Sequence, residues 1–249
     1  MRFSPAVPSP TPRRVMVVAF AVLMAAMPLS LAHADYNAGY QAYRAGNYEM
    51  ARAQWRVAAN DNDPRAQYAL GLLYYRGQAG PQDYNQAAEW FGRAAQSNHG
   101  SSLYYLGLMH FNGWGLPFDQ FRATDYFKRA LRINPDNLDA AFLIGEQYFR
   151  GRGATQNYVD AARYYKQAAE KGMAAAQYML GAMYERGWGV ENNLAESYYW
   201  LRRSADHTLQ VPPGADLEAD PLTAIATLEK RLRPEEINRV EARLQTALP

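Results

Sequence analysis

Four glycines in the sequence are each preceded by a pair of residues suited to binding. These pairs are Tyr75–Arg76, Phe111–Asn112, Phe149–Arg150 and Glu185–Arg186. An arginine presents a planar fork of donors that fits a carboxylate, and an aromatic ring supplies rigid contact area. The pairs therefore predict binding of a protein segment, in particular one that contains acids. The alternative for the arginines is that they are solvated helix ends stabilised by the helix dipole.

Other chemistry finds little support in the residue types. The sequence has no cysteine, which excludes a disulfide framework, a thiol nucleophile and a thiolate metal site. Its four histidines, His33, His99, His110 and His207, are far apart, whereas a metal site needs three or four converging ligands. We expect no catalytic, cofactor-binding or metal-binding residues. A regulator of an enzyme, or an enzyme without a recognisable motif, is the third alternative for function.

Glycines at regular spacing organise the chain around these pairs. Gly71, Gly107, Gly145 and Gly181 recur at a nearly fixed period, and each is followed six residues later by Gly77, Gly113, Gly151 or Gly187. A fixed period of this length is typical of a repeat architecture. Apolar residues at intervals of three and four around the first glycine predict an amphipathic helix, which the second glycine ends by adopting a positive φ.

A glycine inside a helix costs about 1 kcal/mol relative to alanine. The first glycine of each repeat is therefore expected where a second helix crosses so closely that a methyl group would clash. The segment after each loop fits this second helix, because small residues alternate there with bulky ones such as Phe91 and Phe127.

One repeat follows a known family pattern almost throughout. Residues 176–205 match Ala-x-x-x-Leu-Gly-x-x-Tyr-x-x-Gly-x-Gly-Val, followed by the Ala, Trp and Ala-Ala positions of the second helix, with Asn193 where aspartate is usual. The chain thus resembles the Sel-one-like repeat family, relatives of the tetratricopeptide repeats. The resemblance implies an all-α fold, a right-handed α/α superhelical solenoid of helical hairpins that serves as a scaffold and is generally not an enzyme. It also implies that first-helix residues, including the four pairs, line the concave groove.

The repeats are predicted at 64–99, 100–135, 136–173 and 174–207. Residues 35–63 predict a degenerate tetratricopeptide-like hairpin before them, and residues 208–249 predict a linker and C-terminal capping helices. Two apolar stripes in the last segment are expected to cover the open end of the solenoid: Leu222, Ile225, Leu228 and Leu232, then Ile237, Val240, Leu244 and Leu248. The alternative is a detachable helix pair that binds a partner.

Residues 1–34 predict a cleavable secretory signal, with a basic start, an apolar run and a small-x-small site before Asp35. An uncleaved anchor and a twin-arginine signal are the alternatives. Cleavage removes three arginines from 26 basic residues and none of the 24 acids. The mature chain then has one more acid than bases, which argues against nucleic acid or anionic lipid as a partner. We expect a periplasmic protein without a membrane span, with secretion as the alternative.

These observations predict a non-catalytic interaction scaffold or adaptor in the bacterial cell envelope that binds a segment of a partner protein. Trp114 and Trp188 stand between glycines at loop tips. Each ring is expected either to pack on the next repeat or to form an edge that binds a sugar or a protein. The second possibility makes a glycan-binding protein, accessory to exopolysaccharide or cell wall, the alternative function.

Overall fold

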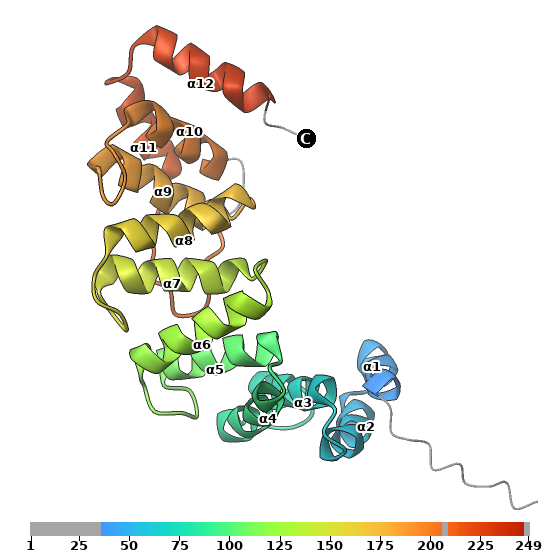
Figure 1. The fold of residues 1–249 in the computed structure, drawn as a ribbon. Coiled ribbons are helices and arrows are strands. Elements are labelled where there is room, and N and C mark those ends of the chain that lie inside the picture. Colours follow the sequence, from blue (N-terminus) through green and yellow to red (C-terminus); the bar gives the residue numbers. More distant parts are fainter. Residues whose placement is uncertain (1–35, 206–208, 247–249) are drawn as a thin grey trace, which may run out of the picture. The chain divides into compact units, whose positions relative to one another are not determined.

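The computed structural model describes residues 36–205 and 209–246, and these residues form helices and no strands (Figure 1). The predicted all-α class is therefore confirmed. The predicted signal segment, its cleavage point before Asp35, and Leu248 lie outside the described residues. The helices are α1 Tyr36–Arg44, α2 Tyr48–Asn60, α3 Pro64–Arg76, α4 Tyr84–Gln96, α5 Gly100–Asn112, α6 Gln120–Ile133, α7 Leu138–Arg150, α8 Tyr158–Glu170, α9 Ala174–Arg186, α10 Leu194–Ala205, α11 Pro221–Glu229 and α12 Pro234–Thr246.

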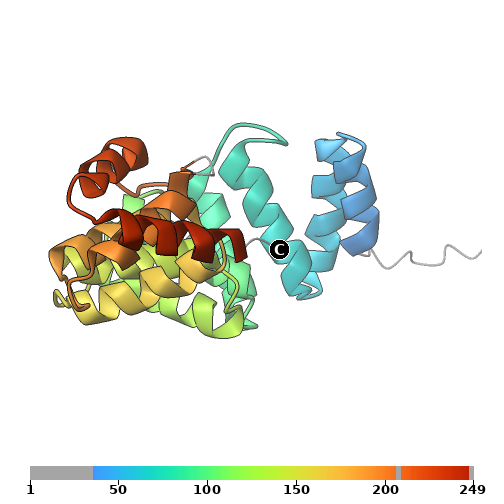
Figure 2. The same cartoon turned by 90° about the horizontal axis from the view of Figure 1, so that it is seen from above.

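The helices pack as consecutive hairpins. The pairs α1–α2, α3–α4, α5–α6, α7–α8 and α9–α10 each form one hairpin, and each hairpin packs on the next. The hairpin α1–α2 stands beside α3 in both views (Figures 1 and 2). This packing is that of an α/α solenoid, in which each unit buries its apolar face against its neighbours.

Local sequence determines where the helices begin and end. The side chain of Asp83 accepts from the backbone N of Gln86 at the start of α4, and Asp119 does the same for α6. These residues satisfy backbone donors that a helix leaves free at its first turn. At the other end, α3, α5, α7 and α9 each stop at a glycine with φ between 65° and 72°. A positive φ costs glycine little, so the predicted C-caps are confirmed.

The first glycine of each repeat admits the second helix of its own hairpin. A β-carbon on Gly71 would lie 2.5 Å from the Phe91 ring, and one on Gly107 would lie 2.5 Å from the Phe127 ring. In the later repeats Tyr165 and Leu201 fill the same space at Gly145 and Gly181. Because these bulky side chains are fully buried, they could not move aside for a methyl group. The predicted close crossing is confirmed.

A further glycine in three of the loops contacts the preceding repeat. A β-carbon on Gly115 would overlap the carbonyl group of Tyr84, one on Gly189 would overlap that of Tyr158, and one on Gly153 would overlap that of Gln120. These carbonyl groups belong to the first residue of α4, α8 and α6. The loop backbone therefore lies directly on the start of a helix in the repeat before it.

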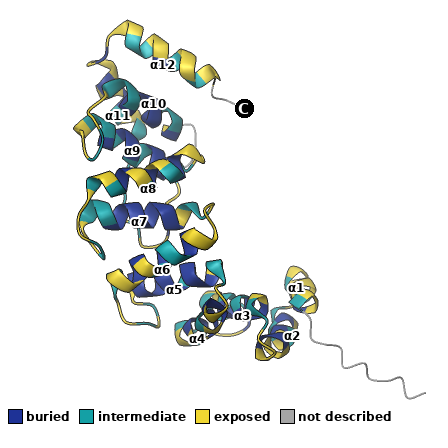
Figure 3. Cartoon of the chain, viewed as in Figure 1, coloured by how far each residue is buried: buried dark blue, intermediate teal, exposed yellow. Residues whose placement is uncertain are grey.

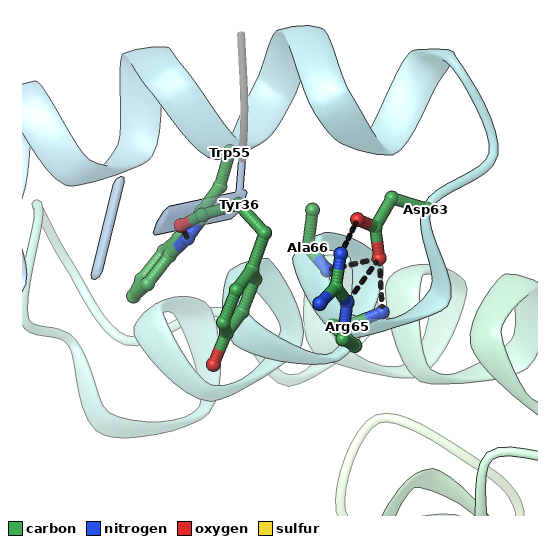
Figure 4. A network of polar contacts seen from close by, with 5 residues as sticks. All are labelled: Tyr36, Trp55, Asp63, Arg65 and Ala66. Atoms are coloured by element: carbon green, nitrogen blue, oxygen red, sulfur yellow. Dashed lines mark hydrogen bonds and ion pairs between the residues drawn. The ribbon is translucent and has the colours of Figure 1, made fainter. Parts of the chain in front are cut away.

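The N-terminal hairpin is fixed by a small polar network (Figure 4). Trp55 of α2 donates from Nε1 to the backbone oxygen of Tyr36, 2.9 Å away. Asp63 caps α3 by accepting from the backbone N atoms of Arg65 and Ala66 at 2.8 and 3.4 Å, and it also pairs with the Arg65 guanidinium at 2.7 Å. That guanidinium lies 4.9 Å from the centre of the Tyr36 ring, so the network joins α1, α2 and α3.

The last two helices pack on α10, where their buried residues include Ile225, Leu228 and Val240. The predicted stripe is wrong at Leu222, which is 71% exposed because α11 turns that side chain away from α10. Polar contacts add to the junction: Tyr198 donates to Glu241 at 2.9 Å. Helix α12 is otherwise largely exposed, in contrast to α7, which is buried along most of its length (Figure 3).

Candidate partner-binding face

The four predicted pairs all lie in the last turns of α3, α5, α7 and α9, directly before the glycines that end these helices. We call the surface formed by these ends the first-helix face. Each pair has the same position on the backbone of its repeat, but the side chains have different neighbours from one repeat to the next. The face divides into an N-terminal, a middle and a C-terminal section.

The N-terminal section is rich in tyrosine and holds an arginine without an acidic partner. Arg76 is exposed and donates to the hydroxyl oxygen of Tyr43 at 3.2 Å, which joins α3 to α1. Tyr75 is half-buried, with its ring edge-on to Tyr105 at a centroid distance of 5.1 Å. Burial raises the pKa of Tyr75 to about 12. Among the described residues no carboxylate forms an ion pair with Arg76.

In the middle section the face is covered by the chain itself. Residues 209–220, which we call the strap, leave α10, pass behind α7 in Figure 1 and return to α11. Gly214 of the strap lies against Phe111 and Asn112 of α5. Arg150 of α7 pairs with the Asp216 carboxylate, its Nη1 lying 3.6 Å from Oδ2, and also donates from Nη2 to the backbone oxygen of Asp216. The segment predicted as a linker is thus docked on two repeats.

A buried acid lies beneath the strap. Glu146, one turn before Arg150 on α7, is 7% exposed, and its Oε1 lies 2.9 Å from the Nε of Arg150. Burial raises the pKa of Glu146 despite the nearby guanidinium. The adjacent Gln147 is 1% exposed, and neither atom of its amide has a partner among the described residues. These groups line a cavity of about 270 Å³ together with Phe111, Asn112, Gly214 and Asp216.

The C-terminal section is contacted by the turn that follows α11. Glu185 forms an ion pair with Arg231, which lies two residues after the end of α11. Arg186 is exposed and lies 5.9 Å from the centre of the Trp188 ring. In the described ranges it has no acidic partner, as is the case for Arg76.

The loop tryptophans pack on the preceding repeat, not on the next one, which corrects that alternative. Trp114 stacks on Tyr84 with ring centres 5.6 Å apart, and Trp188 stacks on Tyr158 at 5.8 Å. The direction follows from the loop glycines Gly115 and Gly189, which seat each loop on the helix start that carries the tyrosine. Trp188 keeps 37% of its surface exposed, whereas Trp114 is half-buried.

The described residues offer no assembled metal site. No group of three or more histidine, aspartate or glutamate side chains in ranges 36–205 and 209–246 is placed to hold a metal ion. His110 is buried, with its Nδ1 2.9 Å from the backbone oxygen of Pro117 and its ring stacked on Tyr126. His99 accepts from the backbone N of Ser102 and caps α5. Both histidines have structural roles.

Sequence reasoning identified the four pairs but missed the groups that surround them. The pairing of Glu146 with Arg150 had a signal, because the two residues are four apart on a predicted helix. The contacts of Asp216 with Arg150 and of Arg231 with Glu185 gave no such signal in the sequence, because the paired residues are 66 and 46 positions apart.

The repeats identify the family. The model of the Sel1 repeat matches residues 64–99, 100–134, 138–173 and 174–208. The chain therefore belongs to the Sel1 repeat family, and proteins built from such repeats are typically non-catalytic scaffolds for protein–protein interaction. In the described ranges no helix combines the length and apolar character needed to cross a membrane.

Solved structures share this fold. A Sel1 repeat protein from Oxalobacter formigenes is similar with a TM-score of 0.66 and 23% identity, over 86% of each chain. A protective antigen of uropathogenic Escherichia coli with an SLR fold, c5321, is similar with a TM-score of 0.53 and 19% identity, over 87% of this chain and 57% of that one. No curated protein sequence matches the chain.

Proposed function

We propose that this protein is an exported, non-catalytic scaffold of the bacterial cell envelope that binds an extended segment of a partner protein along the first-helix face. One observation carries the proposal. The N-terminal section of that face presents Arg76 without an acidic partner beside the tyrosines Tyr43, Tyr75 and Tyr105. Arginine and tyrosine are enriched among the residues that dominate binding energy in protein interfaces.

Charge supports an acidic segment as the ligand. The exposed cations Arg76 and Arg186 lie at the two ends of the row of helix ends, and neither is neutralised by a carboxylate in the described part of the chain. A carboxylate from a partner would gain a charge-assisted hydrogen bond at either end. Arg150 is different, since Glu146 and Asp216 already pair with it.

The proposal can be tested by site-specific photocrosslinking in intact cells. A photoreactive residue at position 76 should capture a partner, because Arg76 is exposed on the first-helix face. The matched controls are Phe121 of α6 and Val159 of α8, which are 73% and 65% exposed on second helices. Equal capture from all three positions would contradict the proposal.

Charge reversal gives a second test of the same face. The double change Arg76→Glu and Arg186→Glu should abolish capture of an acidic segment, and Arg163→Glu on α8 should leave it unchanged. Both variants should keep the helical circular dichroism of the parent. An unchanged set of captured proteins in the double variant would show that the first-helix face is not the binding surface.

Location in the envelope is a separate part of the proposal. It is supported by the basic, apolar and small-x-small pattern of residues 1–34. The protein purified from a periplasmic fraction should begin at Asp35 when its N-terminus is sequenced. Retention of residues 1–34 in that protein, or its recovery only from the cytoplasm, would refute this part.

Glycan recognition is a second candidate function because Trp188 keeps 37% of its surface exposed. Its ring stacks on Tyr158, which holds the indole in a fixed orientation. Soluble glycans that stack on this surface should change the tryptophan fluorescence of the parent and leave that of a Trp188→Phe variant unchanged. No difference between the two proteins would remove this candidate.

A further inference from the structure

The strap contacts the repeats through its backbone, through the carboxylate of Asp216 and through partly buried apolar side chains, among them Ala215 and Leu217. Pro212 of the strap is buried, and Ala215 donates from its backbone N to the Pro212 oxygen at 3.0 Å, which forms a tight turn. Beyond this turn the strap has no helix or strand. Its docking contacts are those expected of an extended peptide laid across helix ends.

Gly214 is the tightest point of the contact. Its φ is +86°, and a β-carbon there would overlap the Asn112 side chain and lie 2.9 Å from the Phe111 ring. Only glycine combines this backbone angle with such a close approach at little cost. Two residues later, the backbone N of Asp216 donates to Glu146 Oε1 at 3.4 Å, while its carboxylate pairs with Arg150. The recognised feature is thus a glycine followed two positions later by an acid.

The strap fills this site incompletely. The Asp216 side chain is 77% exposed, and its carboxylate lies 3.6 Å from Arg150 Nη1, so solvent screens the pair. Beneath the strap, both polar atoms of the Gln147 amide and Oε2 of Glu146 are buried without partners among the described residues. Buried polar groups without partners cost free energy that a better-fitting ligand would recover. The strap therefore has the properties of a ligand that can be displaced.

We propose that the strap is an internal occupant of the partner-binding face, and that a partner segment with a small residue followed two positions later by an acid displaces it from Phe111, Asn112 and Arg150. The inference rests on the proposed function and names the ligand of its middle section. Because the strap is tethered at both ends by α10 and α11, its effective concentration at the site is high. The apparent affinity for a partner is then the intrinsic affinity multiplied by the fraction of molecules in which the strap is undocked.

The test uses a peptide with the sequence of residues 209–220, labelled with a fluorophore, and the mature protein. A Gly214→Ala variant should release its own strap, because a φ of +86° is strained for alanine and the methyl group would lie 2.9 Å from the Phe111 ring. Glu218→Ala is the matched control, since Glu218 is an exposed strap residue. Fluorescence anisotropy should show that the peptide binds the Gly214→Ala protein about tenfold more tightly than the parent or the control. Equal affinity for all three proteins would overturn the inference.

A second variant keeps the test decisive if one methyl group shifts the strap without releasing it. Residues 210–218 are replaced by a glycine-serine linker of equal length, which leaves α11 and α12 attached to α10. This protein should bind the peptide at least as tightly as the Gly214→Ala protein, and a peptide carrying Asp216→Lys should bind neither. Absence of peptide binding to the linker variant would overturn the inference.

The outcome is separable from that of the proposed function. Crosslinking at position 76 measures a section of the face that the strap does not contact. If a partner is still crosslinked at position 76 but the peptide does not bind the linker variant, the inference about the strap is wrong and the proposed function stands. If the peptide binds and position 76 captures nothing, the strap has the predicted site and the proposed partner at the N-terminal section is wrong.

Discussion

The ring of Phe91 occupies the space that a side chain on Gly71 would need, at 2.5 Å from an ideal β-carbon. The two residues belong to the two helices of one hairpin, and Phe91 is fully buried. The same relationship joins Gly107 to Phe127 in the next repeat. The spacing between paired helices is therefore set by a glycine on one and a large side chain on the other.

Gly71→Ala should destabilise the protein although alanine favours helices. Overpacking against a fully buried ring costs about 1 to 3 kcal/mol, which exceeds the gain in helix propensity. Gly92→Ala is the matched control, because Gly92 lies inside α4 and, beyond its chain neighbours and the backbone of its own helix, nothing comes within 4 Å of the added methyl group. That variant should be more stable by up to about 1 kcal/mol. Urea unfolding measures both, and effects of the same sign would contradict this account.

Gly189→Ala should be more harmful than an alanine at another glycine of similar φ. The added methyl group would overlap the Tyr158 carbonyl and push the loop, with Trp188, away from the preceding repeat. Gly46 has a φ of +76° and open space around it, so Gly46→Ala reports the backbone strain alone, about 1 to 2 kcal/mol. Thermal unfolding should rank Gly189→Ala clearly below Gly46→Ala. Equal losses would mean that the contact with Tyr158 does not support the array.

Leu228→Ala should loosen α11, whereas Leu222→Ala should have almost no effect. Leu228 is fully buried at the junction with α10, and its truncation is expected to cost about 2 to 5 kcal/mol. Leu222 is on the same helix but 71% exposed. Hydrogen exchange of the α11 backbone should increase in the first variant only. A similar response to both changes would show that α11 does not dock through Leu228.

Glu146→Gln should change how stability depends on pH. Because burial raises the pKa of Glu146 above its ordinary 4.5, the folded protein holds this proton at pH values where the unfolded chain has lost it. The contribution of Glu146 to stability therefore falls as pH rises from about 4.5 through the folded pKa, and then stays constant. The free energy of unfolding of the parent minus that of the variant should decrease over this range. A difference that is flat or rises with pH would refute the assignment.

The helices were predictable from the sequence because their signals are local. The glycines that end α3 and α5, Gly77 and Gly113, are recognised by position alone, and their φ values of 65° and 72° satisfy the expectation. The crossings were also predictable, since Gly71 and Phe91 recur together with the period.

Contacts between distant residues were not predictable in this way. The direction in which Trp114 packs depends on how Gly115 seats its loop on Tyr84, which no spacing encodes. The docking of the strap depends on Asp216 meeting Arg150 after a turn at Pro212. A pattern around Pro212 and Gly214 predicts an irregular segment, but it does not indicate which surface that segment covers.

The strap also changes how the array is expected to unfold. In a simple solenoid each unit contacts only its neighbours, so unfolding can proceed inward from either end. Here the hydrogen bond from Asp216 to Glu146 joins positions 70 apart, so the strap links the end of the fourth repeat back to the third. Unfolding that starts at the C-terminus must break this contact before it reaches α9, whereas unfolding that starts at α1 does not. The two ends of the repeat array are therefore expected to differ in cooperativity, with the contact between Asp216 and Glu146 opposing the separation of the fourth repeat from the third.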